Sequence, residues 1–389
     1  MILISNSNTD KVATEHFEAC APEIKRRIKF LIDFFELLFD KKFTISLKKK
    51  EILSHYYGVD AETMKLMIDF FLKKKKKKTV YNINKLTLIF TSGGAKNDFV
   101  YNPKMYREYQ KFFQNAHGNL DIILKGMPQD LFKYVLENND YKVQNDEPIK
   151  SLLSIVFPYE YLTGSTQFSK VDKSKWNSYE LTKRLGLSVC PYCNKNWINT
   201  VFGKDGGKIT NPQLDHFFCK TEHPLLRLSF YNLVPSCETC NVRIKGSTQF
   251  EYNINLNPYE NGYGNIGKMR AFAKNVKSFE GVGSDYRIKL VTDSKASSEV
   301  RKQIYIHHRF FKIQEIYEHH GDIISEIYFK KLKYGATYLQ DLSKVKMFKG
   351  MKIGELYRMA FSNYHNEEDF SKRPFSKLTK DTVEFLEII

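Results

Sequence analysis

Cysteine, acidic residues and long apolar runs are all scarce in this sequence. It holds six cysteines in 389 residues, and 44 aspartates and glutamates stand against 61 lysines and arginines. No segment reaches the roughly 18 consecutive apolar residues of a membrane-spanning helix. The start, MILISNSNTDKVATEH, lacks the basic segment and the small-residue cleavage site of a signal peptide. We therefore expect a cytoplasmic protein without membrane contact, whose paired cysteines bind metal rather than form disulfides.

The excess of basic residues favours a polyanionic partner. The net charge is +17 and the isoelectric point is near 9.3. Nucleic acid is the expected partner at such a charge. Charge alone does not decide this, because many lysine-rich proteins are merely soluble. The chain is 42% apolar and can bury a core, and its length predicts two or three domains.

Residues 1–147 are expected to form a mainly helical domain. The segment APEIKRRIKFLIDFFELLF repeats apolar residues at helical spacing, and Pro22 is expected at the start of this helix. Asp60 is expected to cap a second helix, which ends in the lysine run Lys73 to Lys78. That run is typical of a solvated helix end, but it also suits contact with phosphates. Residues 102–140 predict further helices.

Residues 291–389 are expected to form a C-terminal helical domain. Patterns such as VRKQIYIHHRFFKIQEIYEHH and KIGELYRMAFSNY are helical, and no turn-separated alternating strands interrupt them. The pairs His307-His308 and His319-His320 are expected to be ordinary packing or surface residues, because neighbours on a helix point about 100° apart. The polar passage ENNDYKVQNDEP marks the border between the N-terminal domain and a central domain, residues 148–290.

The central domain holds the residues expected to carry chemistry. Cys190 and Cys193 form a C-x-x-C pair. The segments WINTVF and KIT are expected to be strands joined by a tight turn at Asp205-Gly206. LDHFF predicts another short strand. Because neighbours on a regular strand face opposite sides, we expect this strand to end or bulge at Asp215-His216.

A second C-x-x-C pair, Cys237 and Cys240, follows in YNLVPSCETCNVRIKG. Two such pairs can bind one tetrahedral Zn²⁺ through four thiolates, so Cys190, Cys193, Cys237 and Cys240 are the expected ligands of a structural zinc. A thioredoxin-like redox pair is the alternative, but neither pair stands at a clear strand-to-helix junction of a βαβ unit. Cys20 and Cys219 are expected to be ordinary small side chains.

Taken in order, these motifs resemble the HNH endonucleases over residues 186–262. The order is C-x-x-C, Asp-His, Asn, and then C-x-x-C followed by a polar residue and Lys-Gly. LDHFFCK, HPLLRLSFYNLVPSCETCN and NPYENGYGN are similar to HNH proteins encoded beside an ABC-type ATPase in prokaryotic anti-phage systems, including Septu and some retron systems. The resemblance implies an α+β fold with mainly helical regions flanking a zinc-braced ββα-metal HNH core.

The resemblance also implies roles for single residues. His216 would be the general base that takes a proton from the attacking water, a role that suits an imidazole with a pKa near neutrality. Asp215 and Asn241 would bind a catalytic divalent cation, and Asn232 would hold the loop that orients the histidine. The last motif position is Asn241 rather than histidine, and an amide oxygen favours Mg²⁺ or Mn²⁺.

Two basic residues follow Asn241 on the expected helix. Lys245 lies four residues after it and shares its face, so we expect Lys245 near the same phosphate. Arg243 would point away from the metal and contact a flanking phosphate at most.

The sequence thus predicts a metal-dependent HNH endonuclease that hydrolyses phosphodiester bonds of nucleic acid, with DNA as the expected substrate. An ABC-type ATPase partner in antiviral defence is expected from the resemblance. Two alternatives stay open: a zinc-stabilised nucleic-acid-binding module that has lost catalysis, and a subunit whose helical regions dock on an ATPase.

Overall fold

The structure is a computed structural model that describes residues 1–4, 8–39, 58–69, 103–137, 147–164, 167–171 and 174–388. In these ranges helices dominate and the strands form two-stranded sheets, in keeping with the expected α+β class. No described helix is both long and apolar enough to cross a membrane. The lysine run Lys73 to Lys78 lies outside the described residues.

The chain divides into two compact units. The helical unit comprises Ala13–Glu180 and Phe218–Leu233, and the cysteine unit comprises Met1–Val12, Leu181–Phe217 and Val234–Ile389. The borders expected near residues 147 and 290 therefore fall inside units rather than between them. Each unit is assembled from separate stretches of the chain.

Most of α1 (Thr9–Phe39), a single long helix, belongs to the helical unit. Its buried Phe35 packs against Tyr106, Tyr109 and Phe113 of α5 (Pro103–Gly118). Pro22 lies inside α1 rather than at its start, so the expected start was wrong. The preceding residues, TDKVATEHFEACA, already form helix, and one proline costs that helix a single backbone hydrogen bond and some bending.

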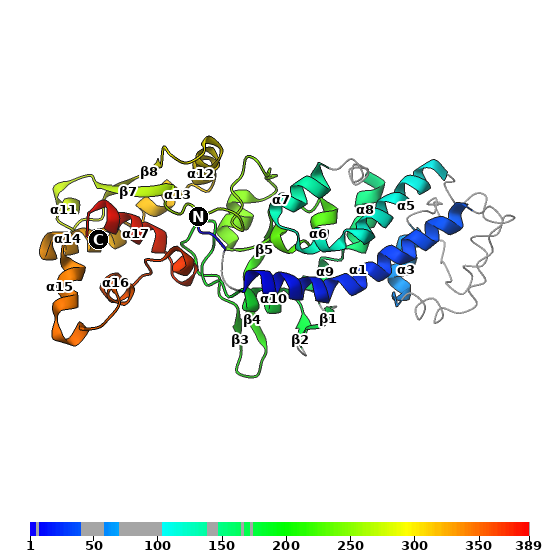
Figure 1. The fold of residues 1–389 in the computed structure, drawn as a ribbon, viewed down its shortest axis with the longest axis horizontal. Coiled ribbons are helices and arrows are strands. Elements are labelled where there is room, and N and C mark those ends of the chain that lie inside the picture. The colour runs from blue at the N-terminus through cyan, green and yellow to red at the C-terminus, as the bar shows by residue number, and fades with distance from the viewer. Residues whose placement is uncertain are drawn as a thin grey trace. The chain divides into compact units, whose positions relative to one another are not determined.

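The helical unit contains the helices expected over residues 102–140, as far as these residues are described. Asp60 caps α3 as expected, because its carboxylate accepts from the N–H groups of Glu62 and Thr63. The elements, shown in Figure 1, are α3 (Ala61–Asp69), α5, α6 (Leu120–Lys125), α7 (Pro128–Leu131), η2 (Phe132–Leu136), α8 (Glu147–Val156), α9 (Glu160–Thr163), β1 (Phe168–Val171), β2 (Ser174–Trp176), η4 (Pro224–Leu226) and η5 (Phe230–Asn232).

The elements of the cysteine unit stand before, between and after the two cysteine pairs in the sequence. They are α10 (Ser178–Leu185), β3 (Val201–Phe202), β4 (Lys208–Thr210), β5 (Gln213–His216), β6 (Leu233–Ser236), η6 (Thr239–Lys245), β7 (Gly267–Ala273), α11 (Val276–Phe279), β8 (Tyr286–Thr292), α12 (Ser298–Phe310), α13 (Ile313–Glu318), α14 (Gly321–Tyr334), α15 (Tyr338–Lys344), η7 (Lys346–Phe348), α16 (Ile353–Phe361), η8 (Glu367–Lys372) and α17 (Ser376–Phe385). The expected hairpin is confirmed: β3 pairs with β4 across a turn in which Gly206 has a φ of 79°.

A long hairpin and the C-terminal helices pack together in this unit. β7 and β8 pair antiparallel from Gly267↔Thr292 to Ala273↔Tyr286, and α17 packs against β7 (Figure 1). In α17, Asp381 accepts the backbone N–H of Met269 on β7 at 2.8 Å and forms a buried ion pair with Lys377. This hairpin has seven-residue strands that were not predicted.

The first residues of the chain belong to the cysteine unit as well. The N–H of Ile2 donates to the carbonyl of Pro191 (2.9 Å), and the N–H of Ile4 donates to the carbonyl of Pro258 (2.7 Å). The N–H of Tyr263 donates to the carbonyl of Met1 (3.2 Å). The N-terminal residues are thus tied to the segments that carry and follow the cysteine pairs.

Candidate metal centre and active-site strand

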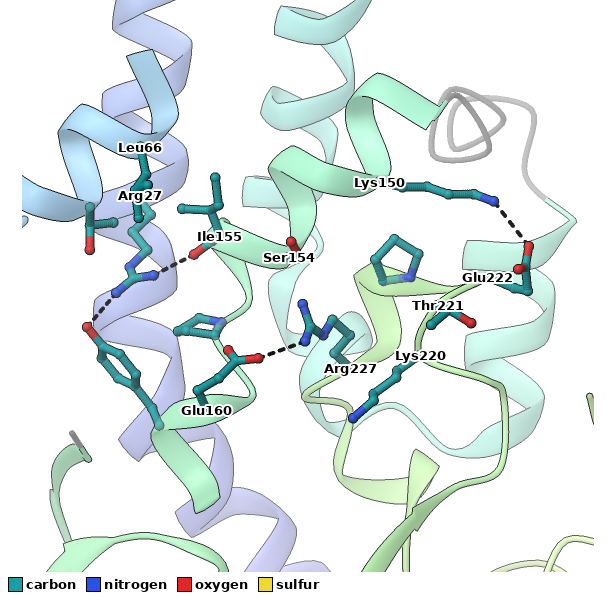
Figure 2. Close-up of a pocket in the computed structure, with 14 residues that line it drawn as sticks. Arg27, Leu66, Lys150, Ser154, Ile155, Glu160, Lys220, Thr221, Glu222 and Arg227 are labelled. Carbon is teal, nitrogen blue, oxygen red and sulfur yellow. Dashed lines mark hydrogen bonds and ion pairs between the residues drawn. The ribbon is translucent and has the colours of Figure 1, made fainter. Parts of the chain in front are cut away.

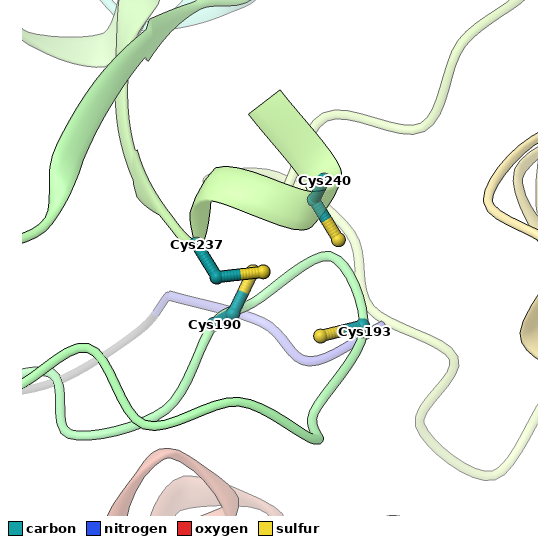
Figure 3. Close-up of side chains that lie close together, drawn as sticks. All are labelled: Cys190, Cys193, Cys237 and Cys240. Carbon is teal, nitrogen blue, oxygen red and sulfur yellow. The ribbon is translucent and has the colours of Figure 1, made fainter. Parts of the chain in front are cut away.

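Four cysteines from two distant segments meet in the cysteine unit. Cys190 and Cys193 lie in a loop after α10, Cys237 follows β6, and Cys240 lies in η6. All four are buried, and their sulfur atoms lie within 4.8 Å of one another. Figure 3 shows the four side chains turned toward a common centre.

The backbone around the first pair is shaped for such a cluster. Asn194 adopts a left-handed conformation with a φ of 48°, which turns the chain so that its N–H donates to the carbonyl of Cys190 (2.8 Å). The Asn196 amide donates to the sulfur of Cys237 at 3.2 Å, a contact that favours a thiolate there. The loop thus fixes the backbone at Cys190 and supplies a hydrogen-bond donor to the sulfur of Cys237.

The electrostatics of the cluster also favour a cation. Hydrogen bonds from the neighbouring thiols, that of Cys190 first, lower the pKa of Cys237, whereas burial raises the pKa of Cys190. The pKa of Cys193 is lowered as well, by its hydrogen bond with Cys190 first, so thiolates are favoured at Cys193 and Cys237, but four thiolates would repel each other in a buried space without a dication. A tetrahedral zinc site with Zn–S bonds of about 2.3 Å places its sulfurs about 3.8 Å apart, so the donor set is compatible with structural zinc.

Among the described residues, neither cysteine pair lies in the βαβ unit expected of a thioredoxin-like redox site, because β6 before the second pair is paired with β5 and the next strand, β7, is paired with β8. The convergence of both pairs on one centre is the stronger reason, since a redox dithiol acts as one pair. Cys219 and Cys20 lie outside this cluster. Cys219 contacts the Thr221 hydroxyl, and Cys20 is buried 3.8 Å from His16 Nε2.

Asp215 is held by two donors in the interior. Its carboxylate accepts from the Tyr192 hydroxyl at 2.6 Å and from the Lys245 ammonium at 2.8 Å. The Asp215 and Lys245 side chains are only 4% and 3% exposed. Tyr192 stands between the two cysteines of the first pair and stacks on Phe311, with ring centroids 4.7 Å apart. Both cysteine pairs are therefore linked to Asp215, one through Tyr192 and the other through η6.

This arrangement changes what is expected of Lys245. Its ammonium also donates to the backbone carbonyl of His216 at 2.7 Å, and it lies 4.8 Å from the Phe250 ring centroid. A buried ammonium with these partners does not face a phosphate, so the expected phosphate contact does not fit Lys245. Nor does Asp215 offer an open carboxylate oxygen to a divalent cation while Lys245 is paired with it.

His216 is the last residue of β5, so the strand ends at the Asp-His dipeptide as expected. The His216 side chain lies in a largely buried position, with the residue 8% exposed. β5 is hydrogen-bonded to β6, and η6 follows β6 in the chain. Gln213 and Asp215, which share one face of β5, both contact η6.

Asn241 and Arg243 lie on η6 but differ in their surroundings. The Asn241 amide donates to Gln213 Oε1 at 2.9 Å, next to Asp215 along the same face of β5. Arg243 is 74% exposed and pairs loosely with Glu238 at 3.4 Å. The structure thus brings Asn241 to the face of β5 that carries Asp215 and leaves Arg243 at the surface.

Asn232 forms hydrogen bonds to the backbone of the loop after β5, within the helical unit. Its side-chain oxygen accepts the Phe218 N–H at 2.7 Å, and its amide donates to the carbonyls of Phe218 (3.1 Å) and Leu226 (2.9 Å). The side chain is fully buried. Asn232 therefore fixes the backbone two residues after His216.

Sequence reasoning missed Tyr192 and the partners of Lys245. Tyr192 could have been noticed, because it stands between two metal-ligand candidates and is a large polar-tipped side chain. His307, expected to be an ordinary packing residue, is buried in α12, where Tyr263 Oη lies 2.9 Å from its Nδ1.

Comparisons with protein-family models, with curated proteins and with solved structures return no significant match for this chain.

Proposed function

We propose that this protein is an HNH endonuclease that hydrolyses phosphodiester bonds of nucleic acid, with DNA as the first substrate to test. The observation that carries the proposal is the order β5, β6, η6. Asp215-His216 end β5, Asn232 precedes β6, and the second cysteine pair leads into η6 with Asn241. Two strands and a helix with these residues at these places are what a ββα-metal nuclease requires. A structural zinc at the four cysteines belongs to the same proposal.

In the proposed reaction, His216 takes a proton from a water molecule. The water oxygen then forms a bond to phosphorus while the bond to the leaving oxygen breaks. Asn232 acts on the loop rather than on the substrate, since its side chain is occupied with backbone groups of Phe218 and Leu226. Mg²⁺ or Mn²⁺ would stabilise the charge that develops on the phosphate and the leaving oxygen.

The proposed ligands of that cation are Asp215 and Asn241, and they require one rearrangement. Because the Lys245 ammonium is paired with Asp215, it must withdraw before Asp215 can bind a divalent cation. The closed pair also supports the second candidate function, a zinc-stabilised nucleic-acid-binding module without catalysis. In that case Lys245 takes the place of the metal permanently, and Asp215 serves the fold alone.

A cleavage assay separates the two candidates. Plasmid, single-stranded DNA and RNA are incubated with the protein and Mg²⁺ or Mn²⁺, with and without EDTA. We expect metal-dependent cutting that falls by about 10²- to 10⁴-fold in His216→Ala. The matched control is His319→Ala, because His319 is an exposed histidine in the same unit. Binding without cutting under every metal would favour the binding module.

The ATPase partner, the role in antiviral defence and the cytoplasmic location are proposals from the resemblance alone. Copurification from the native host tests the partner. Isolation of a fully active protein without any associated ATPase would count against it.

A further inference from the structure

A cavity of about 660 Å³ opens in the helical unit. It is lined by α1, α3, α8, α9 and the loop Lys220–Arg227. Figure 2 shows the side chains that face it. Four of them are basic, namely Arg27, Lys150, Lys220 and Arg227, whereas two are acidic, Glu160 and Glu222. Hydroxyls of Thr63, Ser154 and Thr221 add neutral hydrogen-bonding groups to the wall.

Arg27 supplies a fixed positive charge at this cavity. Its guanidinium donates to the carbonyl of Ile155, to the Tyr161 hydroxyl and to Glu23. The side chain is 2% exposed. Arg27 is therefore a structural group, and the ligand contacts must come from the other basic residues.

In two ion pairs at the wall of the cavity, the cation is much less exposed than the carboxylate. Lys150 pairs with Glu222 at 3.1 Å, and Arg227 pairs with Glu160 at 3.0 Å. The cations are 16% and 11% exposed, whereas Glu222 and Glu160 are 43% and 68% exposed. Ion pairs with a well-solvated partner are weak, because water screens them. The carboxylates can therefore turn into solvent while the Lys150 and Arg227 side chains stay in the wall of the cavity.

Residues 220–227 follow His216 closely in the sequence, and this favours a nucleic-acid phosphate as the anion. Lys220 is exposed, lies 4.8 Å from the Tyr159 ring centroid, and follows His216 by four residues. Four residues span at most about 14 Å. Phosphates of one strand in a duplex recur about every 3.4 Å along the axis, so several would lie within reach of this loop if one were bound at His216.

We propose that this cavity binds phosphodiester groups of the nucleic acid that flank the cleaved bond. Arg227, Lys150 and Lys220 would contact the phosphates, and Glu160 and Glu222 would leave the cations as the phosphates bind. The inference rests on the proposed function, since His216 is what brings the nucleic acid to the loop. Because both ion pairs must open before a phosphate can bind, replacing Glu160 or Glu222 should strengthen nucleic-acid binding, and this direction of change is what the test measures.

The test measures oligonucleotide affinity by fluorescence anisotropy, with His216→Ala as the background and EDTA present. We expect Arg227→Gln and Lys150→Gln each to weaken binding by about threefold to tenfold and to flatten the salt dependence by about 0.7 to 0.9 log units per log unit of salt. We expect Glu160→Gln and Glu222→Gln to tighten binding by about threefold. Lys111→Gln is the matched control, because Lys111 is exposed on α5 in the same unit and lies outside the cavity.

The outcomes are separable from those of the proposed function. Unchanged or weaker binding in Glu160→Gln overturns the cavity proposal, and this variant does not threaten folding because Glu160 is 68% exposed. An Arg227→Gln effect equal to that of Lys111→Gln overturns it too. Displacement of the oligonucleotide by an equal concentration of inorganic phosphate would assign the cavity to small anions instead. Wild-type cutting with unaffected cavity variants refutes the cavity alone, whereas the expected binding changes without cutting in any metal refute the nuclease alone.

Discussion

Replacing Lys245 with methionine removes one half of the buried ion pair with Asp215. The methionine keeps most of the aliphatic stem, so the main change is the loss of the ammonium. Asp215 would be left with the Tyr192 hydroxyl as its remaining described donor, in a side chain that is 4% exposed. Removing one partner of a buried pair typically costs about 3 to 5 kcal/mol, because the other charge stays buried without compensation.

The assay is urea unfolding followed by far-UV circular dichroism, with the midpoint compared at equal metal content. The double variant Asp215→Asn/Lys245→Met removes both charges and keeps an acceptor for Tyr192, so we expect it to be more stable than Lys245→Met alone. The matched control is Arg243→Met. It breaks the Arg243–Glu238 pair, whose side chains are 74% and 61% exposed, and should cost less than about 1 kcal/mol.

The same variant bears on the proposed catalytic cation. Without the ammonium, the buried carboxylate is open to a dication, so we expect Mn²⁺ to stabilise Lys245→Met more than it stabilises the wild-type protein. A loss of stability no larger than that of Arg243→Met would refute the buried pair. Equal effects of Mn²⁺ on both proteins would refute Lys245 as the group that a dication must displace.

The other predictions concern the cysteines, His16 and Asn232. We expect about one zinc per chain by elemental analysis, lost in Cys193→Ser but kept in the control Cys219→Ser, because Cys219 lies outside the cluster; zinc retained by both variants would contradict the site. Burial lowers the pKa of His16 to about 4, so the unfolded chain binds its proton more tightly. The stability that neutral His16 contributes is complete above pH 6.5 and falls by about 3 kcal/mol as the pH drops to 4. His16→Gln should therefore lower by about one the number of protons that the protein takes up on unfolding in this pH range. Asn232→Leu removes three buried hydrogen bonds to the backbone of Phe218 and Leu226, so a melting point within a degree of wild type would contradict the role described for Asn232.

The features predicted correctly from sequence depend on neighbours in the chain. Asp60 caps α3 because the geometry of a helix start is local, and the turn at Asp205-Gly206 forms because glycine accepts a positive φ. The convergence of four cysteines was also predictable, since C-x-x-C spacing brings two sulfurs together by itself.

The features that were missed depend on residues far apart in the chain. The reach of Lys245 across to Asp215 depends on how η6 packs on β5, which no local pattern specifies. Pro22 was placed at a helix start because proline favours that position, yet α1 extends through it with the buried residues Ala19, Cys20 and Ile24 on either side. β7 and β8 do alternate buried and exposed residues in part, so closer attention to MRAFA and RIKLV could have predicted the hairpin.

The interleaving of the two units sets an order for their formation on the ribosome. The helical unit is complete once Leu233 has emerged, whereas the cysteine unit needs residues up to the C-terminal helices. At about 5 to 20 residues per second, the delay between them is on the order of 10 to 30 seconds. During that time Met1, Ile2 and Ile4 have no complete unit to join. The nascent protein thus carries a folded helical body before its cysteine unit can close, although all four clustered cysteines have been synthesised by Cys240.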